Sequence, residues 1–197
     1  MIYLIGVTAC KWDSLIPIEE LWTAYERIIK ENGAIVLFSQ GLFSARLMLS
    51  NEKLYKYTWI WKKGERTSGF LNAKKMPLRN HEDILVFYKK QPTYNPQFTE
   101  GKESHGRGTK IYSKDSTSVY QPIKQMDSEK TNLKYPKTIL NFDKPHPPVH
   151  PSQKPVALCE YLIRTYTNEG DIVLDNCMGS RKYRRCLHEH RKKFHRY

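Results

Sequence analysis

The sequence has 197 residues, of which 39% are hydrophobic and 12% aromatic, a composition typical of globular proteins rather than disordered ones. This length suits one domain that carries a smaller embedded module. No apolar run approaches the roughly 20 residues that a membrane-spanning helix requires, and the N-terminus lacks the pattern of a signal peptide. The four cysteines are irregularly spaced, so we expect reduced thiols in a cytoplasmic protein with no membrane partner.

The formal net charge is +13, which favours a polyanionic partner such as nucleic acid. The charge is unevenly distributed, because residues 181–197 hold eight Lys or Arg and one Glu, a net charge of +7. The other residues carry the remaining +6. A run of charge is more often a solvated surface than a binding site, so charge alone does not identify the partner.

The first elements in the chain alternate between helix and strand. Apolar residues recur at helical spacing over residues 17–32, and Gly33 should end this helix in the left-handed conformation. Residues 34–38 (AIVLF) form a continuous apolar run, as expected of a strand that is buried on both faces. A turn over residues 39–41 should lead into a second helix that ends near Ser50.

Later elements continue this alternation. Residues 55–61 (YKYTWIW) and 83–88 (DILVFY) are predicted strands. Pro155 should open a helix that runs to about Thr167. Gly170 follows that helix, and residues 171–175 (DIVLD) form the last predicted strand. The pattern favours an α/β sheet.

A long polar stretch interrupts this pattern. Residues 89–143 are rich in Gly, Ser, Thr, Tyr and Pro, and are too long for a plain connection within a compact domain. They therefore form an inserted module, a lid or a disordered loop. Residues 144–155 contain five prolines, so they should form an extended connection.

The most informative pattern lies where the last strand ends. The segment DIVLDNCMGS places Asp175 at the end of a buried strand, directly before a turn that contains Gly179 and Ser180. Ligands of α/β sheets bind beyond the carboxyl ends of the strands, where tight turns bring backbone N–H groups close. Taken alone, the segment also fits an ordinary turn. The segment HPSQKP over residues 150–155 precedes the same helix.

In this order, HPSQKP, a helix and DIVLDNCMGS resemble the DNA amino-methyltransferases, which methylate adenine at N6 or cytosine at N4. The order of motifs is that of the permuted β-type subgroup. Residues 6–13 (GVTACKWD) resemble the segment after the catalytic tetrapeptide, and residues 80–83 (NHED) resemble a later core motif. The resemblance covers roughly residues 6–180. It implies a Rossmann-like α/β methyltransferase sheet with helices on both faces, incomplete in this chain, and a target-recognition region at 89–143.

The resemblance also implies a reaction and a set of site residues. Such enzymes transfer a methyl group from S-adenosylmethionine to the exocyclic amine of adenine, which we favour here, or of cytosine. The target base is flipped out of duplex DNA. The candidate cofactor-binding residues, carried over from the two motifs, are Ser152, Gln153, Lys154, Asp175, Asn176, Cys177, Gly179 and Ser180. Two alternatives stay open: Lys154 could be a surface lysine, and Asp175 could merely cap a strand end.

The implied division places the catalytic half at 1–88, target recognition at 89–143, cofactor binding at 144–180 and a basic tail at 181–197. The family pattern breaks at two points. The residues before Gly6 are MIYLI rather than an Asp-Leu-Pro-Tyr type of tetrapeptide, so no catalytic residue is assigned. After Ser180 the sequence reads RKYR, where the family has Gly-x-Thr-Gly.

A frameshift at each break would explain both departures. Residues 1–5 can be written in codons that encode Asp-Leu-Pro-Tyr when the reading frame is shifted. Residues 181–197 can likewise be written in codons that begin with Gly-Asn-Thr-Gly in a shifted frame. On this hypothesis the enzyme is impaired or inactive. The DNA sequence of the gene tests the hypothesis, because it shows whether these codons are present. The alternatives are a divergent enzyme with a genuine basic tail, and a non-catalytic basic DNA-binding protein. No metal is expected, because the spacing of Cys186, His188, His190 and His195 matches no zinc site.

Overall fold

The computed structural model describes residues 17–103, 130–148 and 153–175, and also the backbone of residues 193–195. The chain divides into two compact units. One, the insertion unit, spans Pro96–Pro136, and the other, the sheet unit, holds the residues on either side of it. No helix of the described residues is long and apolar enough to cross a membrane.

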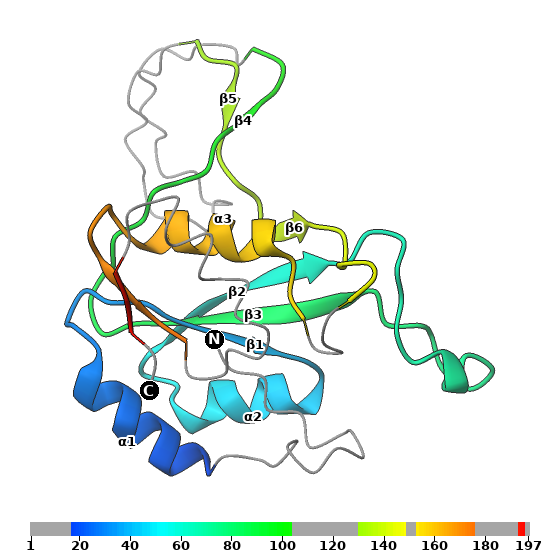
Figure 1. The fold of residues 1–197 in the computed structure, drawn as a ribbon, viewed down its shortest axis with the longest axis horizontal. Coiled ribbons are helices and arrows are strands. Elements are labelled where there is room, and N and C mark those ends of the chain that lie inside the picture. Colours follow the sequence, from blue (N-terminus) through cyan, green and yellow to red (C-terminus); the bar gives the residue numbers. More distant parts are fainter. Residues whose placement is uncertain (1–16, 104–129, 149–152, 176–192, 196–197) are drawn as a thin grey trace, which may run out of the picture. The chain divides into compact units, whose positions relative to one another are not determined.

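The sheet unit is built on four strands in the order β1-β3-β2-β6, shown in Figure 1. They are β1 (Ile35–Ser39), β2 (Tyr55–Lys62), β3 (His81–Phe87) and β6 (Ile139–Asn141). Strand β3 is antiparallel to both β1 and β2, whereas β6 is parallel to β2. Strands β1, β2 and β6 therefore run in one direction, and their carboxyl ends lie at the edge of the sheet where β3 begins.

Two helices cover one face of this sheet: α1 (Ile18–Ile28) and α2 (Leu42–Ser50) (Figure 1). Side chains alternate between the two faces of a strand, and alternate residues of β1 and β3 therefore point toward these helices. The core on this face consists of Leu21, Trp22, Tyr25, Ile35, Leu37, Leu47, Leu85 and Phe87.

Helix α3 (Val156–Tyr166) covers the opposite face. The core there consists of Phe38, Trp59, Trp61, Ile84, Val86, Leu140, Leu158, Leu162 and Tyr166. Two hydrogen bonds join the end of α3 to β2. The Trp59 indole N–H donates to the Tyr166 hydroxyl at 2.6 Å, and the hydroxyls of Tyr57 and Tyr166 lie 2.6 Å apart. Helices on both faces were expected, and the two cores confirm that arrangement.

The predicted elements occur within a few residues of their expected bounds, except at the end of α1. This helix ends at Ile28, and Ile29 is already extended. The prediction of a left-handed Gly33 is wrong, because the positive-φ glycines in the described part of the chain are Gly41, Gly64, Gly69 and Gly170. A Cβ at position 33 would lie 2.6 Å from Cδ1 of Ile29, so the end of that side chain would have to move.

The polar stretch at 89–143 contributes to both units. Strand β6 pairs with β2 in the main sheet. The insertion unit contains β4 (Thr99–Glu100) and β5 (Leu133–Lys134), which pair antiparallel. After α3, the short strand β7 (Ile172–Leu174) pairs in parallel with β8 (Lys193–His195).

Candidate functional site

The candidate site lies at the edge of the main sheet where β1, β2 and β6 end and β3 begins; we call it the site edge. The strand register aligns Ser39 with Asp83 across β1 and β3. Lys62 aligns with His81 on one side and with Asn141 on the other. Ligands of α/β sheets bind outside the carboxyl ends of strands, so polar residues at this edge are the first candidates for function.

A buried carboxylate at the site edge bridges two lysines. Glu82, the second residue of β3, accepts from the Lys63 ammonium at 2.6 Å through one oxygen. It accepts from the Lys154 ammonium at 2.9 Å through the other oxygen. Lys63 directly follows β2, and Lys154 lies two residues before α3. The three residues, here called the buried ion cluster, therefore fasten the segment that leads into α3 to two strands of the sheet.

Burial controls the electrostatics of this cluster, whose three residues are each at most 5% exposed. Burial raises the pKa of the Glu82 carboxyl, an effect that the neighbouring Lys63 opposes. Burial also lowers the pKa of the Lys154 ammonium well below its ordinary range. Aromatic faces partly replace the lost water, because the Lys154 Nζ lies 5.1 Å from the ring centre of Phe38 and 5.4 Å from that of Trp61.

A second polar cluster joins the end of β1 to the start of β3. The Ser44 hydroxyl donates to a carboxylate oxygen of Asp83 at 2.5 Å. The hydroxyls of Ser39 and Ser44 lie 3.0 Å apart. Ser44 stands in the first turn of α2, which Gly41 allows to start by adopting a φ of 59°. The cluster thus fixes the β1–α2 turn beside the site edge.

Replacing Ser44 with alanine should lower the free energy of unfolding by about 1–2 kcal/mol, because the part-buried Asp83 carboxylate loses a hydroxyl donor. Urea denaturation measures this change. Thr23→Ala is the control, since the Thr23 hydroxyl bonds only to an exposed helix carbonyl, and we expect a change within about 0.5 kcal/mol. Equal effects of the two substitutions would show that the serine cluster contributes no stability.

Of the residues that were predicted from the sequence to bind the cofactor, three lie in the described part of the chain. Asp175 is buried and directly follows β7. Gln153 is half-buried. Lys154 is fully buried in the ion cluster, so its interpretation as a surface lysine is wrong. The nominated residues outside the described part are Ser152, Asn176, Cys177, Gly179 and Ser180.

The segment at 6–13 and the cysteine and histidines of the basic tail also fall outside the described side chains. Within the described part, no group of three His, Cys, Asp or Glu residues is arranged to hold a metal ion.

Sequence reasoning missed Lys63 and Glu82 as parts of the site. The segment NHED was noted only as a motif, and Lys63 was not considered. The sequence did contain a signal for Glu82. This residue lies two positions before the apolar run of residues 84–87, in a strand that is buried on both faces. A glutamate there needs a cationic partner.

Comparison with known proteins identifies the family. The model of the DNA methylase family, which comprises N6 and N4 methyltransferases, matches residues 10–194. The chain belongs to this family. The type II methyltransferase M.HpaI of Haemophilus parainfluenzae is 27% identical over 157 residues. The match covers 78% of this chain and 45% of that protein, so the chain spans less than half of this relative.

Two solved structures share the fold. The M1.HpyAVI–SAM complex has a TM-score of 0.59 and 22% identity, over 95% of this chain and 78% of that one. The PvuII DNA methyltransferase, described as cytosine-N4-specific, has a TM-score of 0.62 and 13% identity, over 91% and 64% of the two chains. The expected Rossmann-like methyltransferase fold is therefore confirmed.

Proposed function

We infer that the chain is by descent an S-adenosylmethionine-dependent DNA methyltransferase for the exocyclic amine of adenine, or else of cytosine, in duplex DNA, and that its departures from the family pattern impair its activity. The observation that carries this proposal is the family match over residues 10–194. Sheet topology supports it, because three strands end at one edge beside the segment that leads into α3. The M1.HpyAVI structure, which shares the fold, is a complex with this cofactor.

The described residues fit such a cofactor. When bound, S-adenosylmethionine supplies an electrophilic methyl group on a cationic sulfur. It also carries hydroxyl and amino donors, from which a carboxylate such as the buried Asp175 can accept. Gln153 can contribute an amide. The Lys154 ammonium already forms an ion pair with Glu82. In this proposal Lys154 therefore positions the segment before α3 rather than holding the cofactor.

Target-base access completes the proposal. An exocyclic amine cannot be reached inside a base pair, so the base must be flipped into the site. The insertion unit, Pro96–Pro136, is proposed as the target-recognition region. Two products are distinguishable by mass spectrometry of digested DNA: N6-methyladenine and N4-methylcytosine.

Asp175→Asn should weaken S-adenosylmethionine binding by about tenfold or more, because a charged acceptor becomes neutral. Isothermal titration calorimetry measures this binding. Asp171→Asn is the matched control: its carboxylate accepts from the Asn168 backbone N–H at 2.7 Å, a bond that the new amide oxygen can keep. Equal affinity of wild type and Asp175→Asn would remove Asp175 from the cofactor site.

Transfer of labelled methyl groups to duplex DNA tests the activity itself. A non-catalytic DNA-binding protein is the second candidate, favoured by the net charge of +13. It requires duplex binding that is independent of S-adenosylmethionine, with no methyl transfer. A duplex-binding measurement with and without the cofactor, made beside the methyl-transfer assay, therefore separates the two candidates.

A further inference from the structure

The loop at 64–80, which joins β2 to β3, exposes apolar side chains at its far end. We call it the tip loop. Leu71 is 99% exposed and Phe70 79% exposed, and Met76 is exposed nearby. The first two belong to the short 3-10 helix η1 (Phe70–Asn72). Single exposed apolar residues are ordinary, but adjacent ones at the end of a projecting loop indicate a contact surface.

The tip loop has a defined backbone conformation. At its base, the Lys63 N–H donates to the Asn80 carbonyl at 2.8 Å, and Ser68 and Arg79 form a reciprocal antiparallel bridge. At its end, Gly69 adopts a φ of 86°, and the Asn72 N–H donates back to the Gly69 carbonyl at 2.9 Å. The loop therefore presents its apolar end in a fixed form, which lowers the entropy cost of inserting it into a partner.

The charge around this apolar end is positive. The loop carries four basic residues and one acidic residue, Glu65, and all five are exposed. Lys74 and Lys75 follow η1 almost directly, and Arg66 and Arg79 lie nearer the base. An apolar end bordered by lysines complements a polyanion that has an apolar interior. Duplex DNA has that combination, because stacked bases lie between rows of phosphates.

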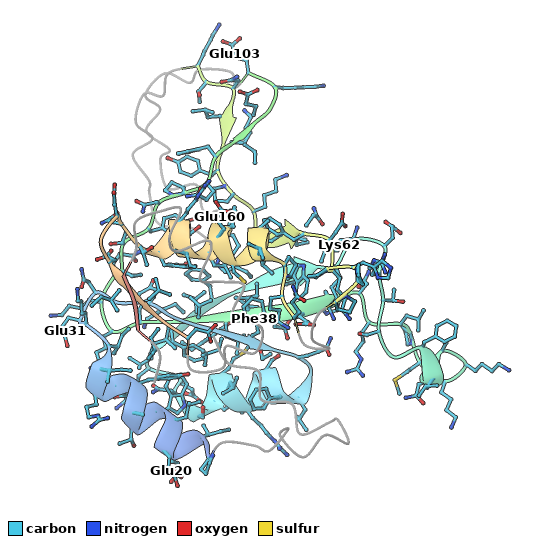
Figure 2. All side chains as sticks on the ribbon, in the orientation of Figure 1. Glu20, Glu31, Phe38, Lys62, Glu103 and Glu160 are labelled. Carbon is cyan, nitrogen blue, oxygen red and sulfur yellow. The ribbon has the colours of Figure 1, made fainter. Side chains whose placement is uncertain are left out.

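The tip loop starts and ends at the site edge. It leaves β2 beside Lys63 and returns to β3 just before Glu82. A side-chain bond from Arg79 to Gln40, 3.2 Å long, and one from Gln40 to the His81 carbonyl, 2.8 Å long, tie its base to the β1–α2 turn. Figure 1 shows the loop projecting past the ends of β2 and β3, and Figure 2 shows side chains standing outward along it. A duplex held at the site edge would lie within reach of the loop.

We propose that the tip loop is a DNA-contacting element that inserts Phe70 and Leu71 between base pairs of the duplex while Lys74 and Lys75 contact phosphates. Apolar side chains inserted between base steps unstack and bend DNA, at a cost that the added contacts offset. This inference rests on the proposed function, and it adds a second DNA contact outside the insertion unit.

The test measures binding of the full chain to a fluorescein-labelled duplex of mixed sequence by anisotropy, between about 50 and 200 mM salt. Phe70→Ala/Leu71→Ala should weaken binding about tenfold or more at every salt concentration. Lys74→Ala/Lys75→Ala should reduce the slope of log affinity against log salt by up to about 1.8, since each phosphate contact contributes about 0.9. The control is Leu42→Ala/Leu49→Ala, which removes two leucines that are 72% and 70% exposed on α2, and it should bind as wild type does.

The outcomes separate this proposal from the proposed function. Wild-type affinity in Phe70→Ala/Leu71→Ala overturns the tip-loop proposal and leaves methyl transfer and cofactor binding as they were. A wild-type chain that binds S-adenosylmethionine but no duplex overturns the tip-loop proposal as well. Loss of self-association in the same variant, measured by sedimentation and without loss of DNA binding, would assign the apolar end to a second copy of the chain instead.

Discussion

Replacing Glu82 with alanine is expected to lower the free energy of unfolding by about 3–5 kcal/mol. Glu82 bridges two buried ammonium groups, at 2.6 Å to Lys63 and 2.9 Å to Lys154. Without the carboxylate, both lysines lose the charge partner that they share, in a site that excludes water. The loss of stability therefore comes from the two buried lysines that Glu82 no longer pairs with. The intact cluster stabilises the fold by much less than about 3–5 kcal/mol when it is compared with apolar residues of similar size.

Urea denaturation of wild type and Glu82→Ala measures the effect. Glu31→Ala is the matched control, because the Glu31–Lys90 pair is 3.3 Å long and both side chains are mostly exposed. A pair of that kind contributes at most about 1 kcal/mol. The triple variant Lys63→Met/Glu82→Leu/Lys154→Met should regain most of the loss, since it removes all three charges together. If Glu82→Ala costs no more than Glu31→Ala, the cluster does not hold the segment before α3.

The strands of the main sheet were predictable because burial on both faces leaves a strong sequence signal. Residues 35–38 and 84–87 are continuous apolar runs, and the structure divides each run between two cores by alternation. A run that packs on one face only would have alternated with polar residues. A different signal located β2, because residues 55–61 are rich in aromatic and β-branched side chains. Trp59 and Trp61 both belong to the core on the α3 face.

The parts that escaped prediction depend on contacts between residues far apart in the sequence. Strand β6 has three residues within a polar stretch, and only its pairing with β2 makes it a strand. Likewise, Glu82 and Lys154 are separated by 72 positions, and a lone glutamate or lysine is normally read as a surface residue. Strand β6 and Lys154 have no local sequence signal, whereas Glu82 has one in its place before the buried apolar run of residues 84–87.

Stability should fall steeply above pH 10 because of Tyr166, whose ordinary pKa is 10.0. Burial and the hydrogen bond to Tyr57 raise the pKa of Tyr166, and the Trp59 donor opposes them. The unfolded chain releases this proton near pH 10, while the folded chain retains it. Unfolding is therefore coupled to proton release, and the contribution of Tyr166 is fully present below pH 10 and decreases as pH rises. The expected slope approaches about 1.4 kcal/mol per pH unit once the unfolded chain is ionised, which amounts to roughly 2 kcal/mol between pH 10 and 12.

Tyr166→Phe isolates this contribution. The variant should be less stable at pH 8, because the Trp59 N–H loses its acceptor. Its stability should then fall less steeply above pH 10, with a slope lower by about 1.4 kcal/mol per pH unit. Tyr57, Tyr94 and Tyr161 also have raised pKa values, so a residual slope is expected in the variant. Urea denaturation at pH 8, 10 and 11 measures both slopes. Parallel slopes would mean that Tyr166 ionises as readily in the folded chain as in the unfolded one, which is incompatible with its burial between α3 and β2.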